Sequence, residues 1–442
     1  MISQAHYKPA ATLVSQLRNG KIKSEELLEH FLDRVERFNP KINAIVWQDV
    51  QNARESARAA DARLAAGEKP GPLHGLPMTV KEAFDIAGAP TTIGDPELKN
   101  NIATSDSIAV QRLRAAGAVI FGKTNLPINM ADWQTFNAIH GTTNNPWDTS
   151  RVPGGSSGGS SAALATGMTS IEVGSDIGSS IRNPAHYCGL FGLKPSMGLI
   201  PDEGHGLPDY GAGIDIGVLG PLARSARDLD LMLDILAGPD PVTAKAWQLA
   251  LPKCGKKRLK DFKVAVKLSD PNVDVDDAYA NCLQNFVDKL AEAGATISES
   301  AAPNVDTTRV HDVYLLLLRA ATSKGVDPAQ IDHWDALRDS PKGLDHARYL
   351  NAMIEGNRML HRDWLALNVE RHALRRTYEQ FFTQWDILLC PAAASAAFVH
   401  DHEGERWERY IEVNGRQVPC TDQLFWSGFS GVVYLSLIHI SE

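Results

Sequence analysis

The side chains best suited to chemistry in this sequence are serines set among glycines, together with one lysine. Ser179 and Ser180 stand side by side in "GSDIGSSIRNPAHYCGL" (174–190), and Ser156 lies in an earlier glycine-rich stretch, 75 residues after Lys81. A serine hydroxyl becomes an effective nucleophile only when a neighbouring base takes its proton. The stretch around Ser180 offers no obvious histidine for that role, so the sequence leaves open which group activates Ser180.

Two glycine-rich motifs suggest other chemistry, but their surroundings argue against it. "GAVIFGKT" (117–124) fits the phosphate-loop pattern, yet its intervening residues Ala, Val, Ile and Phe favour a buried strand and "NLP" replaces the required helix. "GGSSGG" (154–159) fits the nucleophile elbow, which needs an apolar strand before it. The preceding "NNPWDTSRVP" is polar and broken by proline. We therefore expect neither nucleotide binding nor an elbow.

The order Lys81, Ser156, Ser180 and its spacing resemble the amidase signature family. "PGGSSGGSSAALATG" and "GSDIGSSIRNPAHYCGLFGLKPS" match the central signature of that family nearly throughout, and "GKTN", "NPWD" and "GPLARSARDLDLML" agree outside it. The resemblance is strong over about residues 70–240, the signature core, and looser elsewhere. It points to the amidase and urethanase-like bacterial branch.

The resemblance implies a role for each of the three residues. Ser180 resembles the nucleophile that becomes acylated, Ser156 the bridging serine held through a cis peptide bond, and Lys81 the base. Such enzymes hydrolyse C–N bonds of amides through an acyl-enzyme, and the same chemistry extends to carbamates and esters, whose tetrahedral intermediates are similar. The alternative within the family is the A-type subunit of a glutamine-dependent tRNA amidotransferase complex. A catalytically idle binding protein is a third possibility.

A lysine acts as a base only when it is uncharged. Its unperturbed pKa is about 10.4, so the site must lower the pKa by burying the amine among neutral groups. Two serine hydroxyls as neighbours of Lys81 satisfy this requirement. Glu82 adjoins Lys81, but successive side chains on a strand point to opposite faces, so we expect its carboxylate to point away.

The turn before Ser180 offers main-chain N–H groups for an oxyanion. The resemblance implies that Ile177, Gly178 and Ser179 form this oxyanion hole. Residue 179 departs from the family pattern, which usually has glycine there. If the position requires a positive φ, Ser179 carries strain; if it does not, the side chain narrows the site.

Several neighbours of the serines have a structural interpretation beside a catalytic one. Asp176 and Arg182 are expected to form a buried ion pair that holds the loop rather than to act directly. Ser157 is expected to support the site through hydrogen bonds. His186 and Cys188 invite a Cys–His interpretation, but packing beneath the loop is favoured.

Strands alternating with helices predict the elements that position these residues, in an α/β fold with a large mixed central β-sheet flanked by helices on both faces. Ser24 is expected to cap a helix over 24–38 that "NP" at 39–40 stops, and Lys81 to end a strand. Further elements are expected as helices at 50–66, from Ser105 or Asp106 to about 116, after Ser225, and at 275–293, 305–323 and 345–382, and as strands at 118–122 and 386–392.

Composition narrows the class of protein. The 442 residues are 43% hydrophobic and 22% charged, with a formal net charge of −9 and a pI of about 5.9, which disfavours nucleic acid as a partner. Five cysteines without a C-x-x-C pair indicate reduced thiols and no zinc site. With no signal peptide and no membrane-length apolar run, we expect a cytoplasmic enzyme, monomeric or homodimeric, acting on a small molecule without cofactor or metal.

The chain is expected to be one domain over 1–442, with a more variable substrate-pocket region at about 241–435. The stretch "MADWQTFN" (130–137) and three later aromatic residues are candidates for a substrate pocket or for core packing: Trp407, Trp426 and Phe429. The last residues, 436–442, include "SLIHISE", which looks like translated adapter sequence. We expect a non-native tail on a truncated environmental clone.

Overall fold

The stretch that matches the phosphate-loop pattern is a buried strand, as its apolar residues predict. It forms β3 (Val119–Thr124), in which every residue is buried. The next element is the short 3₁₀ helix Ile128–Met130, not the long helix that a phosphate loop needs. This stretch therefore belongs to the core.

The computed structural model describes residues 2–206 and 213–439, which fall into two units. Of the described residues, unit 1 holds 2–206, 213, 217–249 and 436–439, and unit 2 holds 214–216 and 250–435. All of the serines and the lysine singled out above lie in unit 1.

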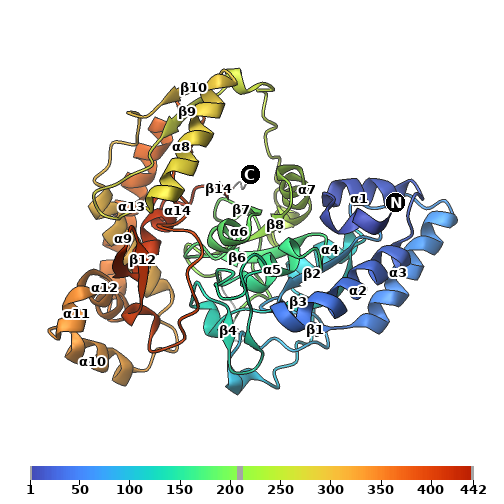
Figure 1. Cartoon of the computed structure of the whole chain (residues 1–442), viewed down its shortest axis with the longest axis horizontal. Coiled ribbons are helices and arrows are strands. Elements are labelled where there is room, and N and C mark those ends of the chain that lie inside the picture. The colour runs from blue at the N-terminus through green and yellow to red at the C-terminus, as the bar shows by residue number, and fades with distance from the viewer. Residues whose placement is uncertain (1, 207–212, 440–442) are drawn as a thin grey trace. The chain divides into compact units, whose positions relative to one another are not determined.

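Apart from one short hairpin, the described strands of unit 1 form two sheets that lie at the centre of this unit (Figure 1). In the first, of order β1-β3-β2, β1 is antiparallel and β2 parallel to β3. In the second, of order β14-β7-β8-β6, neighbouring strands are antiparallel. β2 lies beside β6. The other strands of these sheets are β1 (Ile45–Gln48), β2 (Pro77–Lys81), β6 (Glu172–Asp176), β7 (Phe191–Lys194), β8 (Val218–Ala223) and β14 (Leu437–His439).

Helices pack against both of these sheets. α2 and α3 lie side by side and contact β2 and β3 respectively, α7 contacts β7 and β8, and α5 spans the junction of the two sheets with contacts to β2, β3, β6 and β8. A short hairpin, β4 (Phe136–Asn137) with β5 (Gly141–Thr142), follows β3. The helices are α1 (Ala10–Arg18), α2 (Ser24–Ile42), α3 (Val50–Ala65), α4 (Ile108–Ala115), α5 (Gly158–Ala165), α6 (Arg182–Cys188) and α7 (Ala226–Leu236).

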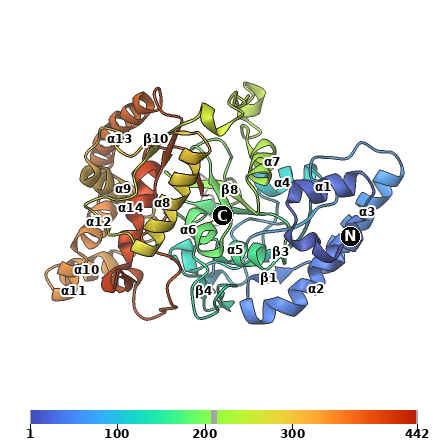
Figure 2. The same cartoon turned by 45° about the horizontal axis from the view of Figure 1, so that its top comes forward.

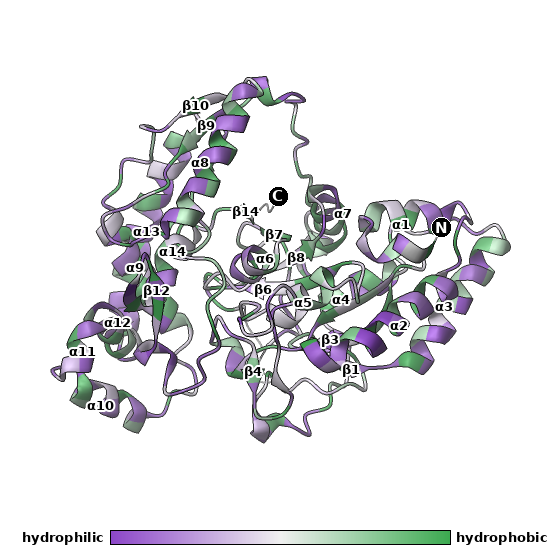
Figure 3. Ribbon diagram, viewed as in Figure 1, coloured by the Kyte–Doolittle hydropathy of each residue, from purple (hydrophilic) through white to green (hydrophobic). Residues whose placement is uncertain are grey.

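The predicted helices of unit 1 exist, but two of their boundaries differ from expectation. Hydrophobic and hydrophilic residues alternate along α2 and α3 (Figure 3). α2 continues through Pro40 to Ile42, although proline has no N–H for a helical hydrogen bond, and ends at Asn43 in the left-handed conformation. Ser24 is not its cap: the Ser24 N–H donates to Asp61, and its hydroxyl donates to the Gly75 carbonyl.

The helix α4 also begins later than its sequence suggests. Neither Ser105 nor Asp106 is its cap; Ser107 is, through an oxygen that accepts the Val110 N–H. Ser225 caps α7 as expected, by accepting the Asp228 N–H. A cap is decided by side-chain rotamer and chain direction, so neighbouring polar residues are hard to separate from sequence.

Unit 2 contains a three-stranded parallel sheet of order β10-β9-β11. The helices of this unit, α8 to α14, are labelled in Figure 2. β12 and β13 form a separate antiparallel pair. Its strands are β9 (Lys263–Val266), β10 (Thr296–Ser298), β11 (Ile387–Leu389), β12 (Tyr410–Val413) and β13 (Arg416–Pro419). Its helices are α8 (Asp277–Glu292), α9 (Thr307–Ala321), α10 (Pro328–Leu337), α11 (Pro341–Asp345), α12 (Ala347–Asn357), α13 (His361–Phe381) and α14 (Leu424–Gly431).

Unit 2 corrects two expectations. The single long helix expected over 345–382 is broken into α12 and α13 by residues 358–360. β11 was expected to be buried, but Ile387 is 42% exposed. The three aromatic pocket candidates, Trp407, Trp426 and Phe429, are at most 2% exposed, which places them in the core of this unit.

The alternation of strands and helices confirms the α/β class in both units. Within the described residues, no helix is both long and apolar enough to span a bilayer. Of the segment expected to be a non-native tail, residues 437–439 form β14 against β7, and residues 440–442 lie outside the described residues.

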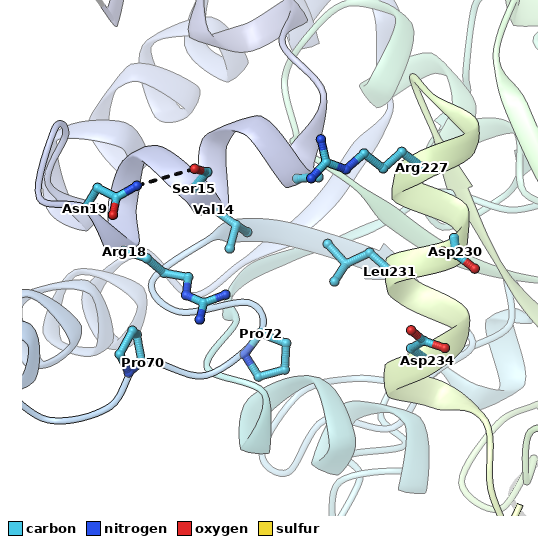
Figure 4. A pocket seen from close by; sticks show the side chains of 11 residues that line it. Val14, Ser15, Arg18, Asn19, Pro70, Pro72, Arg227, Asp230, Leu231 and Asp234 are labelled. Carbon is cyan, nitrogen blue, oxygen red and sulfur yellow. Dashed lines mark hydrogen bonds between the residues drawn. The ribbon is translucent and has the colours of Figure 1, made fainter. Parts of the chain in front are cut away.

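A surface groove of about 630 Å³ lies in unit 1 between α1 and α7 (Figure 4). Arg18 and Asn19 line one side, and Arg227, Asp230 and Asp234 line the other. None of the serine or lysine residues considered for chemistry lines it, so the groove is separate from the candidate active site.

Candidate active site

Lys81 is the last residue of β2, and its side chain is completely buried. Its Nζ lies 2.7 Å from Ser156 Oγ and 3.0 Å from Ser175 Oγ. The strand end and the glycine-rich stretch are 75 residues apart in the sequence, and the fold joins them at this hydrogen bond. The amine therefore has hydroxyl groups as its hydrogen-bond partners.

Ser156 follows a cis peptide bond between Gly155 and Ser156, just before α5 begins. A side chain at Gly155 would overlap the main-chain oxygen of Asp132, so only glycine fits there. The preceding Gly154 has a φ of +85°. These two glycines allow the chain to pass close to its neighbours and to direct Ser156 to the lysine.

Ser180 lies in the turn between β6 and α6 and is 6% exposed. Its main-chain oxygen accepts the N–H of Ser157 at 3.1 Å. This bond brings the turn beside the Ser156–Ser157 segment. The structure therefore gathers Lys81, Ser156 and Ser180 in one region of unit 1.

The environment of Lys81 favours the uncharged amine. Burial lowers the pKa of Lys81 to about 7, although the nearby carboxyl groups of Asp176, Glu172 and Glu82 act in the opposite direction. Glu82 points elsewhere, as strand alternation predicts: its carboxylate accepts the N–H groups of residues 92 and 93. Near neutral pH, a substantial fraction of Lys81 is therefore free to accept a proton.

Asp176 and Arg182 form the expected buried pair. The guanidinium donates two hydrogen bonds to the carboxylate, at 3.0 and 2.8 Å, and the two side chains are 6% exposed or less. Asp176 also accepts the N–H groups of Ser179 and Ile181, each at 3.0 Å. Burial would raise the pKa of Asp176, but Arg182 and these hydrogen bonds outweigh it and lower the pKa to about 2.

The backbone conformation of Ser179 decides whether a serine at this position, where the family usually has glycine, is strained or only narrows the site. Its φ is +76°, so a side chain at this position is strained. Its Oγ is buried with no hydrogen-bond partner. Its N–H donates to Asp176, so an oxyanion at Ser180 would have to share this donor with a carboxylate. Of the other expected donors, Gly178 is held through its carbonyl, which accepts Trp133 Nε1–H at 2.8 Å.

The structure agrees with the expectation for Cys188 but not with the expectation for the Ser157 hydroxyl. The Ser157 hydroxyl, expected to form hydrogen bonds, is buried without a partner, and only its N–H takes part through Ser180. The Oγ lies where a side chain at Gly174 would stand, 2.6 Å from that Cβ position, so it packs against main chain. Cys188 is fully buried and its pKa is raised to about 12 by burial, which fits packing rather than catalysis.

The sequence analysis did not identify two side chains that lie near Lys81: Ser175 and Glu172. Both lie on β6, in "EVGSD". Ser175 is a hydrogen-bond partner of Lys81, and Glu172 is a buried carboxyl group whose pKa burial raises to about 8. Nothing in their spacing marks them, because the placement of β2 beside β6 is a property of the fold.

Comparison with known proteins identifies the family. The family model described as Amidase matches residues 26–424. The chain belongs to the amidase family. This amidase is 32% identical over 394 residues to the indoleacetamide hydrolase of Bradyrhizobium diazoefficiens, a match covering 87% of this chain and 72% of that relative. It is 33% identical over 446 residues to the A subunit of the glutamyl-tRNA(Gln) amidotransferase of Roseiflexus castenholzii, covering 94% and 86%.

A solved structure supports the same fold. The crystal structure of a bacterial aryl acylamidase of the amidase signature enzymes superposes with a TM-score of 0.79 at 23% identity, over 99% of this amidase and 90% of that chain. At this identity the likeness concerns the fold. Family membership, however, identifies this amidase as a serine-based hydrolase acting on amides.

Proposed function

We propose that this amidase hydrolyses the C–N bond of small-molecule amides with Ser180 as nucleophile, Ser156 as proton relay and Lys81 as base. The observation that carries the proposal is the contact of 2.7 Å between Lys81 Nζ and Ser156 Oγ, both buried. A hydroxyl beside a neutral amine can pass on a proton without creating an isolated buried charge.

The proposed acylation follows from this contact. Ser180 Oγ attacks the amide carbon and forms a C–O bond, while its proton passes to Ser156 and the proton of Ser156 passes to Lys81. The C–N bond then breaks, and the lysine returns the proton through Ser156 to the leaving nitrogen. Water then attacks the acyl carbon while its proton passes through Ser156 to Lys81. The C–O bond to Ser180 breaks, Ser180 Oγ takes the proton back through Ser156, and the carboxylic acid leaves.

We place the oxyanion hole at the N–H groups of Ile177, Gly178 and Ser179. The turn lies directly before Ser180, where a carbonyl oxygen would become negative. Because the Ser179 N–H already donates to Asp176, Ile177 and Gly178 carry the greater share in this proposal. The Asp176–Arg182 pair holds the turn and acts on the reaction only through it.

We propose small amides as the principal substrates and carbamates and esters as further ones. All three pass through a tetrahedral oxyanion, so the same nucleophile and donors serve each. The indoleacetamide hydrolase among the relatives makes arylacetamides a first choice to test. A panel of arylacetamide, anilide, carbamate and ester substrates would rank them by kcat/KM.

We also propose that both units act together as one cytoplasmic amidase domain, monomeric or homodimeric. The family match at 26–424 extends across both units, which supports a single functional domain. None of the described cysteines forms a disulfide bond, which fits a reducing compartment. The second candidate function is an A-type amidotransferase subunit, favoured by the relative from Roseiflexus castenholzii.

Covalent labelling tests the nucleophile. A sulfonyl fluoride should modify wild-type protein once, at the peptide containing Ser180, and Ser180→Ala should abolish both the label and amide turnover. Ser157→Ala is the matched control, because its hydroxyl is buried beside the site without a partner; it should still be labelled. Peptide mapping by mass spectrometry decides the outcome, and a label that persists at another serine in Ser180→Ala would disprove the assignment.

A further inference from the structure

We propose that Trp133 is a positioning residue of the oxyanion hole: its indole N–H holds the peptide group between Gly178 and Ser179 so that an N–H, and not a carbonyl oxygen, faces the developing oxyanion. This inference rests on the proposed function, in which Ser180 attacks the substrate and the turn before it binds the oxyanion. It assigns a role to a buried tryptophan that the proposed reaction does not use.

Trp133 is a core side chain that reaches the turn before Ser180. It is 2% exposed, and its Nε1–H donates to the Gly178 carbonyl at 2.8 Å. Gly178 lies two residues before Ser180, among the residues to which we assign the oxyanion hole. An indole has a single N–H donor. A buried tryptophan that uses this donor on one carbonyl therefore fixes the direction in which that carbonyl points.

The main chain around Trp133 is held against the segment that carries Ser156. A side chain at Gly155 would overlap main-chain atoms of residues 132–134, so the two segments are in direct contact. The Thr135 hydroxyl donates to the Gly154 carbonyl at 2.8 Å. The indole is thus anchored on the segment of the relay serine and extends from there to the turn of the nucleophile.

The peptide group between Gly178 and Ser179 is held from both sides. Its carbonyl accepts Trp133 Nε1–H at 2.8 Å, and its N–H donates to Asp176 Oδ1 at 3.0 Å. The C=O and N–H of a trans peptide point in opposite directions within one plane, so the two bonds together set that plane. Asp176 is itself fixed by its ion pair with Arg182.

The backbone conformation of Ser179 favours the opposite orientation of this peptide group. Its φ is +76°, which a residue with a side chain disfavours. Turning the peptide over would change this φ by about 180°, into the negative range. It would also put the Gly178 carbonyl oxygen in the place of the Ser179 N–H, which is an acceptor where we propose donors. The bond from Trp133 opposes this change.

Trp133→Phe removes the indole N–H and keeps an aromatic ring. We expect kcat for an uncharged amide to fall about tenfold with KM unchanged, because the lost bond supports the turn in the transition state and not the binding of substrate. Trp147→Phe is the matched control. Trp147 Nε1–H also donates to a main-chain carbonyl, that of Cys188 at 2.9 Å, but this carbonyl is outside the proposed oxyanion hole; kcat should equal that of wild type.

A transition-state analogue measures the oxyanion hole directly. The probe is an aryl trifluoromethyl ketone: Ser180 Oγ adds to its carbonyl carbon, the proton passes through Ser156 to Lys81, and the carbonyl oxygen becomes an oxyanion. Its inhibition constant should rise about tenfold in Trp133→Phe, in step with the fall in kcat. The corresponding secondary alcohol cannot form the adduct, so its inhibition constant should not change.

Trp133→His separates the hydrogen bond from packing and provides a second variant should Trp133→Phe fold poorly. The imidazole keeps a ring N–H on a smaller ring, so it restores the donor but fills the core less well. We expect it to be less stable than Trp133→Phe and to retain more of kcat per site labelled by sulfonyl fluoride. A purely structural role would give the reverse order of kcat.

Ser179→Gly tests whether Trp133 acts on this peptide group. Glycine tolerates a positive φ, so the peptide has less tendency to turn over and the bond from Trp133 matters less. Trp133→Phe should therefore lower kcat about threefold or less in the Ser179→Gly background, against about tenfold in wild type. Equal losses in both backgrounds, or wild-type kcat and analogue affinity in Trp133→Phe, overturn this inference alone. A label that persists at another serine in Ser180→Ala overturns the proposed function instead.

Discussion

Burial lowers the pKa of more than one lysine in this amidase, so a low pKa does not mark the base. Lys81 and Lys123 are both completely buried, with pKa values of about 7 and about 8. Both lysines donate to a hydroxyl: Lys123 to Thr91, and Lys81 to Ser156. The two hydroxyls differ in position, because the residue after Ser156 is hydrogen-bonded to Ser180. Proximity to Ser180, and not the pKa, is therefore the reason for proposing Lys81 as the base.

At the residue scale, we expect kcat/KM to fall about tenfold for each pH unit below about 7, because the protonated fraction of Lys81 cannot accept a proton. Activity should rise with pH to a plateau. Lys81→Ala should lower kcat/KM by about two to four orders of magnitude. Lys81→Arg should not restore it, because a guanidinium remains charged. The measurement is the pH profile of kcat/KM for an uncharged amide substrate. A rate that is independent of pH down to pH 5 would contradict the role of Lys81 as base.

The turn that carries Ser180 is organised as an element by one carboxylate. The Asp176 carboxylate accepts hydrogen bonds from the N–H groups of Ser179 and Ile181 and from the guanidinium of Arg182. The main chain after β6 therefore curves around this one carboxylate. This arrangement places residue 179 at a positive φ. The strain at Ser179 is a consequence of how the turn is held, since glycine has no Cβ to clash there.

At the element scale, Ser179→Gly should stabilise the protein by about 0.5–1 kcal/mol, because it relieves the positive φ and removes a buried hydroxyl without a partner. Ser179→Ala is the matched control: it removes the hydroxyl but keeps the strain, so it should gain less. Denaturant unfolding of the three proteins measures the difference. Equal stability of the glycine and alanine variants would show that the turn does not store this strain.

The sequence predicted elements well where the signal is local. The apolar run of β3, the serine cap of α7 and the strand end at Lys81 each depend on a few neighbouring residues. The end of α2 and the division of 345–382 into α12 and α13 were missed, because a helix continues or breaks according to what its faces pack against.

At the scale of the whole molecule, the family match spans both units, so the activity should reside in this one chain. We expect the purified chain to hydrolyse an arylacetamide or anilide without any added protein. Ser180→Ala, purified in the same way, is the control for contaminating amidases. Light scattering during gel filtration should give a monomer or a homodimer. Turnover that appears only with an added partner would instead favour the amidotransferase alternative.

The buried strands could be predicted from the sequence, because apolar runs act over short distances, and Lys81, Ser156 and Ser180 were chosen as candidates because their motifs resemble the amidase signature. The other contacts of the site depend on tertiary packing. The fold brought Ser175 and Glu172 beside Lys81, directed the Ser179 N–H to Asp176 and removed water from the amine. Proton affinities depend on burial and on charges from strands distant in sequence, and these exist only once the chain has folded.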